Sequence, residues 1–284
     1  MANEMELMVT CPFEECDNKK TVKIPSYIFE NKQFGTVKIQ INRGIVCPDH
    51  QFVIFVDKKG KIRSYEKIDV QLTVAKPVKE EKVSSKDLNL RAIMQEIGDF
   101  ATLNIIHAFL LDTAVVIFTQ TADEQRRVAI NEVCKALFPD LFELKKPLKF
   151  MKRADFKGFS VKNLLAIDEK GYILSAPWEI NQFEFEEELL QKALNAKDFS
   201  AQKVIFSQSV TSLTKRVEYV RDIIADKDSV YEEDIKTQLK DNFMQKKITD
   251  YDIDLIKEIL KFRYLVDTSK IKIRSFDKLK ESLW

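Results

Sequence analysis

The residues best suited to chemistry are three cysteines and a histidine within the first fifty positions. Cys11 and Cys16 flank a four-residue spacer, and thirty residues later Cys47 and His50 flank a two-residue spacer. Zinc in proteins prefers four sulfur or nitrogen ligands, supplied as two pairs from two tight turns. Each pair here begins with Cys-Pro, and proline favours such a turn. The pattern predicts a Zn²⁺ site with Cys11, Cys16, Cys47 and His50 as ligands.

The predicted zinc site is structural, because four protein ligands leave no open position for a water nucleophile. The alternative is that these residues are unligated thiols and a surface histidine. Cys134 lies on an apolar helical stripe and His107 is flanked by apolar helical residues. We expect a buried thiol at Cys134. At His107 we expect a hydrogen-bonded buried or boundary histidine rather than a base, since no serine or cysteine motif accompanies it.

The low counts of glycine and histidine argue against several classes of enzyme. The chain has six glycines among 284 residues, all isolated, and two histidines. Phosphate-binding loops need clustered glycines, and neutral-pH proton transfer most often uses histidine. Dinucleotide enzymes, P-loop NTPases and histidine-dependent hydrolases are therefore disfavoured. A carboxylate-only active site among the 45 acidic residues stays open, because no sequence pattern identifies one.

Two basic stretches are candidate contacts for nucleic acid or for a protein partner. The first, interleaved with aromatic residues, comprises Lys145, Lys146, Lys149, Lys152, Arg153 and Lys157. The second comprises Lys270, Lys272 and Arg274. The net charge of +1 excludes a strong overall field, so any binding to nucleic acid has to be local. The alternative is that both stretches are solvated surface segments.

Period-two alternation and turn residues place a small β domain at residues 1–75. Strands are expected at 37–41, 52–56 and 62–65, with a Gly60-containing turn before the last. The two cysteine pairs are separated by predicted strands, as in a zinc ribbon. Residues 76–87 are charged and lack aromatics, which is typical of a linker.

Helical periodicity mixed with short apolar runs predicts an α/β domain at residues 88–180. The expected helices are 88–97, 101–111 and one that begins near Asp123 and stops at Pro139, and the expected strands are 114–119, 161–167 and 172–174.

Residues 184–284 are predicted to be helical and to end in a winged-helix-like unit. Helices are expected at 184–196, 204–225, 232–243 and 250–261, and a two-stranded wing at 264–266 and 271–274. The third helix of this unit begins with Asp250, Asp252 and Asp254, which would repel a DNA duplex. These residues favour protein docking over reading of the major groove. The fold class predicted for the whole chain is multidomain α+β.

One stretch of the α/β domain resembles a known family. Residues 103–111 (LNIIHAFLL), 114–119 (AVVIFT) and the helix ending ALFP at 136–139 resemble the core of DENN domains, as do FKGF at 156–159 and NLLAID at 163–168. The resemblance covers residues 88–178. DENN proteins act on Rab-type small GTPases as exchange factors or scaffolds, so the resemblance implies a small GTPase as partner. No catalytic motif of that family is recognisable in this sequence, so the resemblance assigns no catalytic residues. The family's N-terminal longin-like module is not recognisable either.

These patterns together predict a non-enzymatic interaction protein, a scaffold or regulator that contains structural zinc. The alternative is a nucleic-acid-binding, transcription-associated factor, because a zinc ribbon with a winged helix is similar to the architecture of basal transcription factors. The N-terminal residues lack a basic and apolar leader, and no apolar run is long enough for a membrane span. A cytoplasmic protein is therefore expected.

Overall fold

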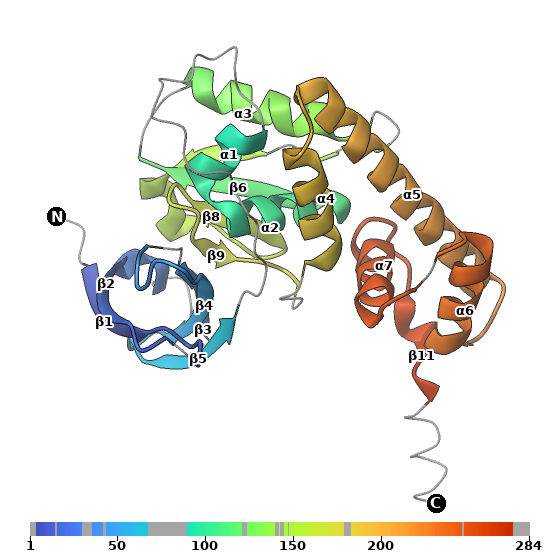
Figure 1. The fold of residues 1–284 in the computed structure, drawn as a ribbon, viewed down its shortest axis with the longest axis horizontal. Coiled ribbons are helices and arrows are strands. Elements are labelled where there is room, and N and C mark those ends of the chain that lie inside the picture. The colour runs from blue at the N-terminus through green and yellow to red at the C-terminus, as the bar shows by residue number, and fades with distance from the viewer. Residues whose placement is uncertain are drawn as a thin grey trace, which may run out of the picture. The chain divides into compact units, whose positions relative to one another are not determined.

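Helices and sheets both build the chain, which confirms the α+β prediction (Figure 1). The computed structural model describes residues 4–14, 16–29, 36–41, 44–67, 90–120, 124–139, 142, 145–146, 148–178, 183–245 and 247–274. The predicted linker 76–87 lies outside these residues. The chain divides into two compact units. Unit 1 is Met1–Ile105, Ala114–Val133 and Pro147–Glu179, and unit 2 is Ile106–Thr113, Cys134–Lys146 and Ile180–Trp284.

Unit 1 begins with two small antiparallel sheets. Strands β1 (Glu4–Thr10) and β2 (Lys19–Pro25) form one, and β3 (Thr36–Ile41), β4 (Phe52–Asp57) and β5 (Ile62–Lys67) form the other in sequential order. A 3-10 turn (Ser26–Phe29) follows β2. The alternation that predicted β3 reflects one buried face, and Figure 1 shows the five strands curled around a common interior.

A four-stranded mixed sheet forms the rest of the β structure of unit 1, in the order β7-β6-β8-β9. Strand β6 (Ala114–Thr119) pairs in parallel with β7 (Lys149–Lys152) and β8 (Leu164–Asp168), and β9 (Ile173–Ser175) returns antiparallel to β8. The apolar run that predicted β6 is buried on both faces from Val115 to Thr119, as expected of a central strand. A 3-10 helix (Arg153–Gly158) follows β7.

Three helices lie in the same part of the chain as this sheet, two before β6 and one between β6 and β7. They are α1 (Leu90–Ile97), α2 (Asp99–Leu110) and α3 (Glu124–Leu137), and all three were predicted within a few residues. Helices α2 and α3 begin in unit 1 and end in unit 2.

One apolar cluster runs through both β parts of unit 1. It joins residues of β1 to β4, such as Val9 and Ile54, with Val116, Phe118 and Leu174 of the four-stranded sheet. Phe118 also meets the ring of Phe156 edge-on at 4.8 Å. Cys11 and Cys47 belong to the same cluster, so the candidate metal ligands sit at the margin of a packed core.

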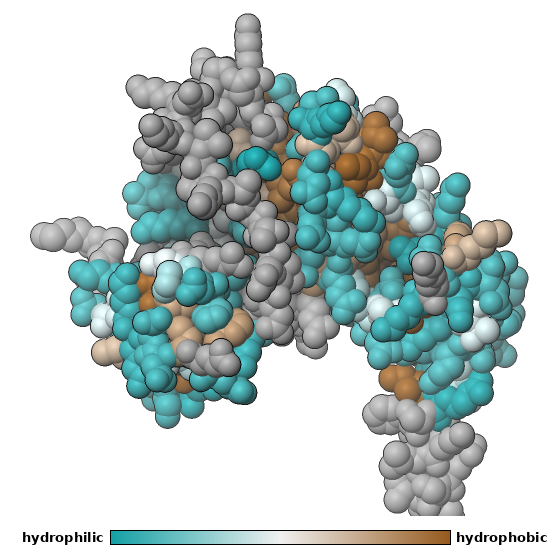
Figure 2. Space-filling model, viewed as in Figure 1, coloured by the Kyte–Doolittle hydropathy of each residue, from teal (hydrophilic) through white to brown (hydrophobic). Residues whose placement is uncertain are grey.

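Unit 2 consists mainly of four helices. They are α4 (Glu184–Leu194), α5 (Phe199–Ala225), α6 (Glu232–Asn242) and α7 (Asp250–Phe262). Helix α7 begins with a capping box in which Thr249 and Asp252 bond each other's backbone N–H groups. Figure 2 shows a mainly hydrophilic surface over α6 and α7.

The predicted two-stranded wing is wrong in its pairing. Tyr264–Val266 forms no strand, and residues Thr268–Lys270 form a 3-10 turn instead. Strand β11 (Ile271–Lys272) pairs in parallel with β10 (Val230–Tyr231), which precedes α6. The chain after α7 therefore returns to the start of α6 rather than folding into a hairpin. The winged-helix resemblance of this region stays a prediction.

In the part of the chain that the structure describes, no helix combines the length and apolar character needed to cross a membrane.

Candidate metal centre

Two loops of unit 1 bring the four predicted ligands together. Cys11 and Cys16 lie between β1 and β2, and Cys47 and His50 lie between β3 and β4. Backbone bonds shape each loop. The Cys11 N–H donates to Asn18 O at 2.9 Å and the Cys16 N–H donates to Phe13 O at 2.9 Å. In the second loop the Gly44 N–H donates to Cys47 O at 2.8 Å.

The geometry of the four donor atoms fits a tetrahedral metal ion. All four lie within 4.8 Å of one another. The Sγ atoms of Cys11 and Cys47 are 3.5 Å apart, and each is 3.5 Å from His50 Nδ1. Donors at the usual zinc–sulfur and zinc–nitrogen distances are separated by about 3.5–3.8 Å along the edges of a tetrahedron. Three thiols and an imidazole in this arrangement could hold a metal ion.

The four ligands differ in exposure. Cys11 and Cys47 are buried at 4% and 3% exposure, whereas Cys16 and His50 are half-buried. The His50 ring stacks on Phe13 with centroids 4.1 Å apart and planes 9° apart, which fixes the imidazole plane. The Asn18 side-chain amide donates to Cys16 Sγ at 3.3 Å, a bond that stabilises a sulfur carrying negative charge.

The two cysteines of the first loop have opposite pKa shifts. Burial raises the pKa of Cys11 to about 12, while the backbone N–H of Asn18 lowers the pKa of Cys16 to about 6. Metal ligation requires the thiolate, so an incoming ion has to displace the proton of Cys11. Binding at this site therefore weakens as the pH falls.

The first basic stretch does not form one defined surface. Lys145 and Lys146 are exposed in unit 2, whereas Lys149 and Lys152 are exposed at the two ends of β7 in unit 1. Arg153 is half-buried, with Nη1 4.0 Å from Glu169 Oε1. The side chain of Lys157 lies outside the described residues.

Two cations of the second basic stretch bind within unit 2. Arg274 Nη2 donates to both carboxylate oxygens of Asp234, at 2.9 and 3.1 Å. Lys270 Nζ donates to the backbone oxygen of Ile224 at 3.1 Å, and Lys272 is exposed. These contacts tie the segment after α7 to α5 and α6, so only Lys272 of the three keeps an exposed charge without such a bond in the described structure.

A buried network in unit 2 involves His107, confirming that this histidine is a hydrogen-bonded core residue. His107 is fully buried, and its Nδ1 lies 2.7 Å from Glu186 Oε1 while its Nε2 lies 3.0 Å from Glu258 Oε2. The hydroxyl of Tyr251 donates to Glu186 Oε2. The network thus joins α2, α4 and α7.

The two carboxylates set the charge of His107. Burial alone would lower the pKa of His107, but Glu186 and Glu258 outweigh it and raise this pKa from 6.5 to about 9. An imidazolium at neutral pH then donates to both carboxylates. Glu186 could have been suspected from the sequence, because it shares the buried face of α4 with Leu189, Leu190 and Ala193. Its partners lie 79 and 65 residues away and left no signal in the sequence.

Comparison of the chain with protein-family models, curated proteins and solved structures finds no match.

Proposed function

We propose that Cys11, Cys16, Cys47 and His50 hold one structural Zn²⁺ ion. The convergence of four donor atoms within 4.8 Å supports this proposal most directly. Thiolates with imidazole suit zinc better than the oxygen-preferring Ca²⁺ or Mg²⁺. The bound ion would join the β1–β2 loop to the β3–β4 loop, and with four protein donors it would have no vacant position for substrate.

Metal analysis tests the zinc proposal. Purified protein is expected to contain about one Zn per chain, and the double variant Cys11→Ser, Cys47→Ser none. The matched control is Cys134→Ser, because Cys134 is a buried cysteine on α3 outside the site. This control should keep its zinc. Full zinc content in the double variant would refute the proposed ligand set.

We propose further that the protein is a non-enzymatic interaction protein, a scaffold or regulator, with a small GTPase as a candidate partner. The DENN resemblance of residues 88–178 suggests this partner. The start of α7 also supports protein docking over DNA reading. Asp250 pairs with Lys236 there, and Asp252 belongs to the capping box. These acids would disfavour a phosphate backbone and leave no base-reading side chain at the helix start.

A binding experiment with defined partners tests the interaction proposal. The full-length protein, immobilised, is mixed with purified Rab-type GTPases in nucleotide-free, GDP and GTP forms, and separately with native lysate. Saturable binding of a GTPase would support the proposed partner. Binding of no GTPase would reject this class, and a lysate without any enriched protein would contradict the interaction function itself.

Binding to nucleic acid is the second candidate function. It is favoured by the exposure of Lys149 and Lys152 on β7, the first strand in the order of the four-stranded sheet. Retention on DNA or RNA should then fall with salt and weaken in Lys149→Gln, Lys152→Gln, since each phosphate contact releases counterions. Lys240→Gln on α6 is the matched control, being exposed and remote in sequence. A lack of retention at low salt would remove this candidate.

A further inference from the structure

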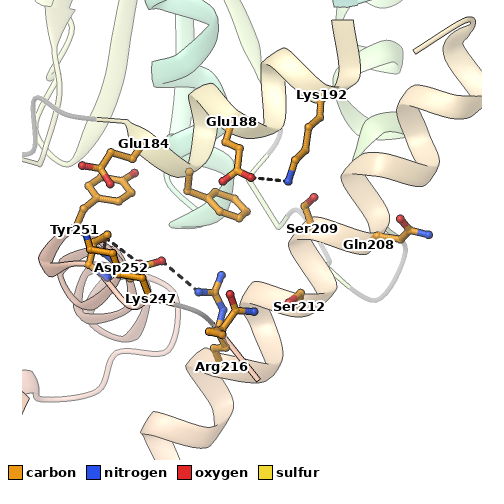
Figure 3. Close-up of a pocket in the computed structure, with 13 residues that line it drawn as sticks. Glu184, Glu188, Lys192, Gln208, Ser209, Ser212, Arg216, Lys247, Tyr251 and Asp252 are labelled. Atoms are coloured by element: carbon orange, nitrogen blue, oxygen red, sulfur yellow. Dashed lines mark hydrogen bonds and ion pairs between the residues drawn. The ribbon is translucent and has the colours of Figure 1, made fainter. Parts of the chain in front are cut away.

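A polar pocket lies within unit 2, between α4, α5 and the segment that leads into α7. Its volume is about 450 Å³, which is large enough for a small organic molecule. Phe185 is the lining residue whose side chain is wholly apolar, while the others carry hydroxyl, amide or charged groups. This lining suits a polar ligand rather than a lipid or an aromatic one. Figure 3 shows the side chains around it.

Arg216 is the one cation of the pocket lining that is buried. It lines the pocket, yet its side chain is only 9% exposed. Nη1 donates to Asp252 Oδ1 at 3.2 Å, whereas the buried Nε has no hydrogen-bond partner in the described structure. A guanidinium has five N–H donors, and buried donors are normally satisfied. This Nε is enclosed by protein atoms, so a molecule in the pocket can reach Arg216 only at the end of its guanidinium.

Asp252 positions Arg216 and already accepts three hydrogen bonds within the protein. Its Oδ2 accepts from the N–H and hydroxyl of Thr249, at 2.8 and 2.9 Å, while its Oδ1 faces Arg216. Glu188 is likewise paired, with Lys192 one turn along α4. Two of the acidic groups in the pocket are thus already engaged by protein cations or donors.

Further donors lie on the same side of the pocket as Arg216. Ser212 precedes Arg216 by four residues and Ser209 precedes Ser212 by three, so all three share one face of α5. Lys247 contributes an exposed ammonium from the segment before α7. Figure 3 shows Glu184 beside Tyr251, away from the two serines. Glu184 has no ion pair among the described residues and suits a donor group at the other end of a ligand.

We propose that this pocket binds a small polar molecule through an oxyanion, a carboxylate or a phosphate, which accepts hydrogen bonds from Arg216, Ser212 and Lys247. Arginine binds both groups well because its planar fork matches two oxygens. The site is separate from the metal centre, which lies in unit 1, and it does not depend on the zinc proposal.

Titration of the full-length protein tests this proposal. The probes are inorganic phosphate and succinate, with succinamide as the uncharged control. The readouts are calorimetry and the NMR signals of the Arg216 guanidinium, which should shift when an oxygen accepts from its terminal N–H groups. We expect saturable binding of one or both anions and none of succinamide. The stronger of the two anions identifies the group that the site prefers.

Variants assign that binding to the pocket. Arg216→Lys keeps the charge but loses the fork, and should weaken anion binding by about tenfold or more. Lys247→Gln and Ser212→Ala change exposed side chains, so they keep the test valid should Arg216→Lys fail to fold. Each should weaken binding several-fold, whereas Lys240→Gln on α6 should not. The proposal is overturned if neither anion binds saturably, or if binding is the same in all these variants.

Discussion

A fully buried imidazole between two carboxylates makes His107 the residue whose charge state most affects unit 2. Both ring nitrogens have an acidic partner, and Tyr251 satisfies the second oxygen of Glu186. Burial, followed by the charge of Glu186, also raises the pKa of Tyr251, so the phenol stays protonated and keeps donating. The network is stable only while His107 is protonated, because a neutral imidazole can donate to one carboxylate at a time.

The stability of unit 2 should therefore fall in mild alkali. The pKa of His107 is about 9 in the folded chain against 6.5 normally. Its stabilising contribution is complete below about pH 6.5 and is lost as the pH rises through about 9, a change of about 3 kcal/mol. Urea unfolding across this range, followed by helical circular dichroism, measures the slope. His107→Gln should unfold more easily and lose this slope.

Glu258→Gln is the companion variant for the pH experiment. It removes one carboxylate but keeps an acceptor near Nε2, so the pKa of His107 should fall. The loss of stability should still begin near pH 6.5, but it should be smaller and level off at a lower pH than in the wild type. NMR titration of the imidazole follows this pKa directly. If His107→Gln retained the wild-type slope, another group would be responsible for it.

Tyr251→Phe tests the hydroxyl at the other end of the network. The substitution keeps the ring but leaves Glu186 Oε2 without its donor in a buried site. Loss of a hydrogen bond to a buried carboxylate should cost about 1–3 kcal/mol in the free energy of unfolding. Tyr219→Phe is the control, because Tyr219 is half-buried and its hydroxyl bonds only uncharged groups, donating to Gln238 at 3.4 Å and accepting from Asn242 Nδ2 at 2.8 Å. Equal losses in the two variants would contradict a special role for the network.

At the scale of elements, the turn between β8 and β9 depends on one glycine. Gly171 has a φ of +82°, and a Cβ at this position would lie 1.9 Å from the backbone oxygen of Ile97, at the end of α1. Asp168 closes the same turn by accepting from the N–H groups of Lys170 and Tyr172 at 2.8 and 3.0 Å. The turn and the end of α1 are in direct contact, so neither can move without the other.

Gly171→Ala should consequently be much more damaging than an alanine at a similar glycine. Gly44 has the same φ of +82°, but no atom lies within 4 Å of a Cβ there. Gly44→Ala should cost about 1 kcal/mol for the left-handed backbone alone, whereas Gly171→Ala should cost more than about 2 kcal/mol. Urea unfolding midpoints give both values. Similar losses in the two variants would show that the backbone of α1 yields to the added methyl group.

Local signals explain which elements could be predicted from the sequence. Helix α7 could be predicted because its apolar residues recur along one face, and β6 because its apolar run is continuous. Strand β7 was missed because its four residues are bounded by two lysines, so the segment resembled a charged surface stretch. The predicted wing failed since a parallel two-residue bridge to β10 has no local sequence pattern.

The candidate sites also differ in how local their residues are in the sequence. The convergence of the four candidate ligands could be predicted because each pair is local and short spacings between cysteine and histidine are found in zinc-binding turns. The His107 network and the Arg216 pocket could not, since their partners are 36 to 151 residues apart in the chain. Only folding brings such residues together, and acidic residues are too common in this sequence to mark a site.

At the scale of the whole molecule, the proposed metal ion would link two segments that are far apart in sequence and that both lie near a shared core. Cys11 and Cys47 are 36 residues apart, and both belong to the apolar cluster that runs into the four-stranded sheet. Removing the ion would open a long loop and leave three thiols and an imidazole without their shared partner. The strands β1 to β5 should be destabilised first.

Chelation should therefore act unequally on the two units. Amide hydrogen exchange after treatment with a zinc chelator is expected to lose protection in β1 to β5 while α5 and α7 keep theirs. Restoring Zn²⁺ should restore the protection. Uniform loss in both units, or no loss in β1 to β5, would contradict a structural ion at this place.

The unequal exposure of the candidate ligands means that the site has a buried side and a more exposed side. Cys11 and Cys47 face the core, while Cys16 lies at the outer side of the site. A thiol reagent should therefore modify Cys16 before the other two, and mass spectrometry of partly alkylated protein can establish this order. If the proposed ion is bound, its exchange with an external carrier should start with the release of Cys16, because this thiol is the least buried of the three.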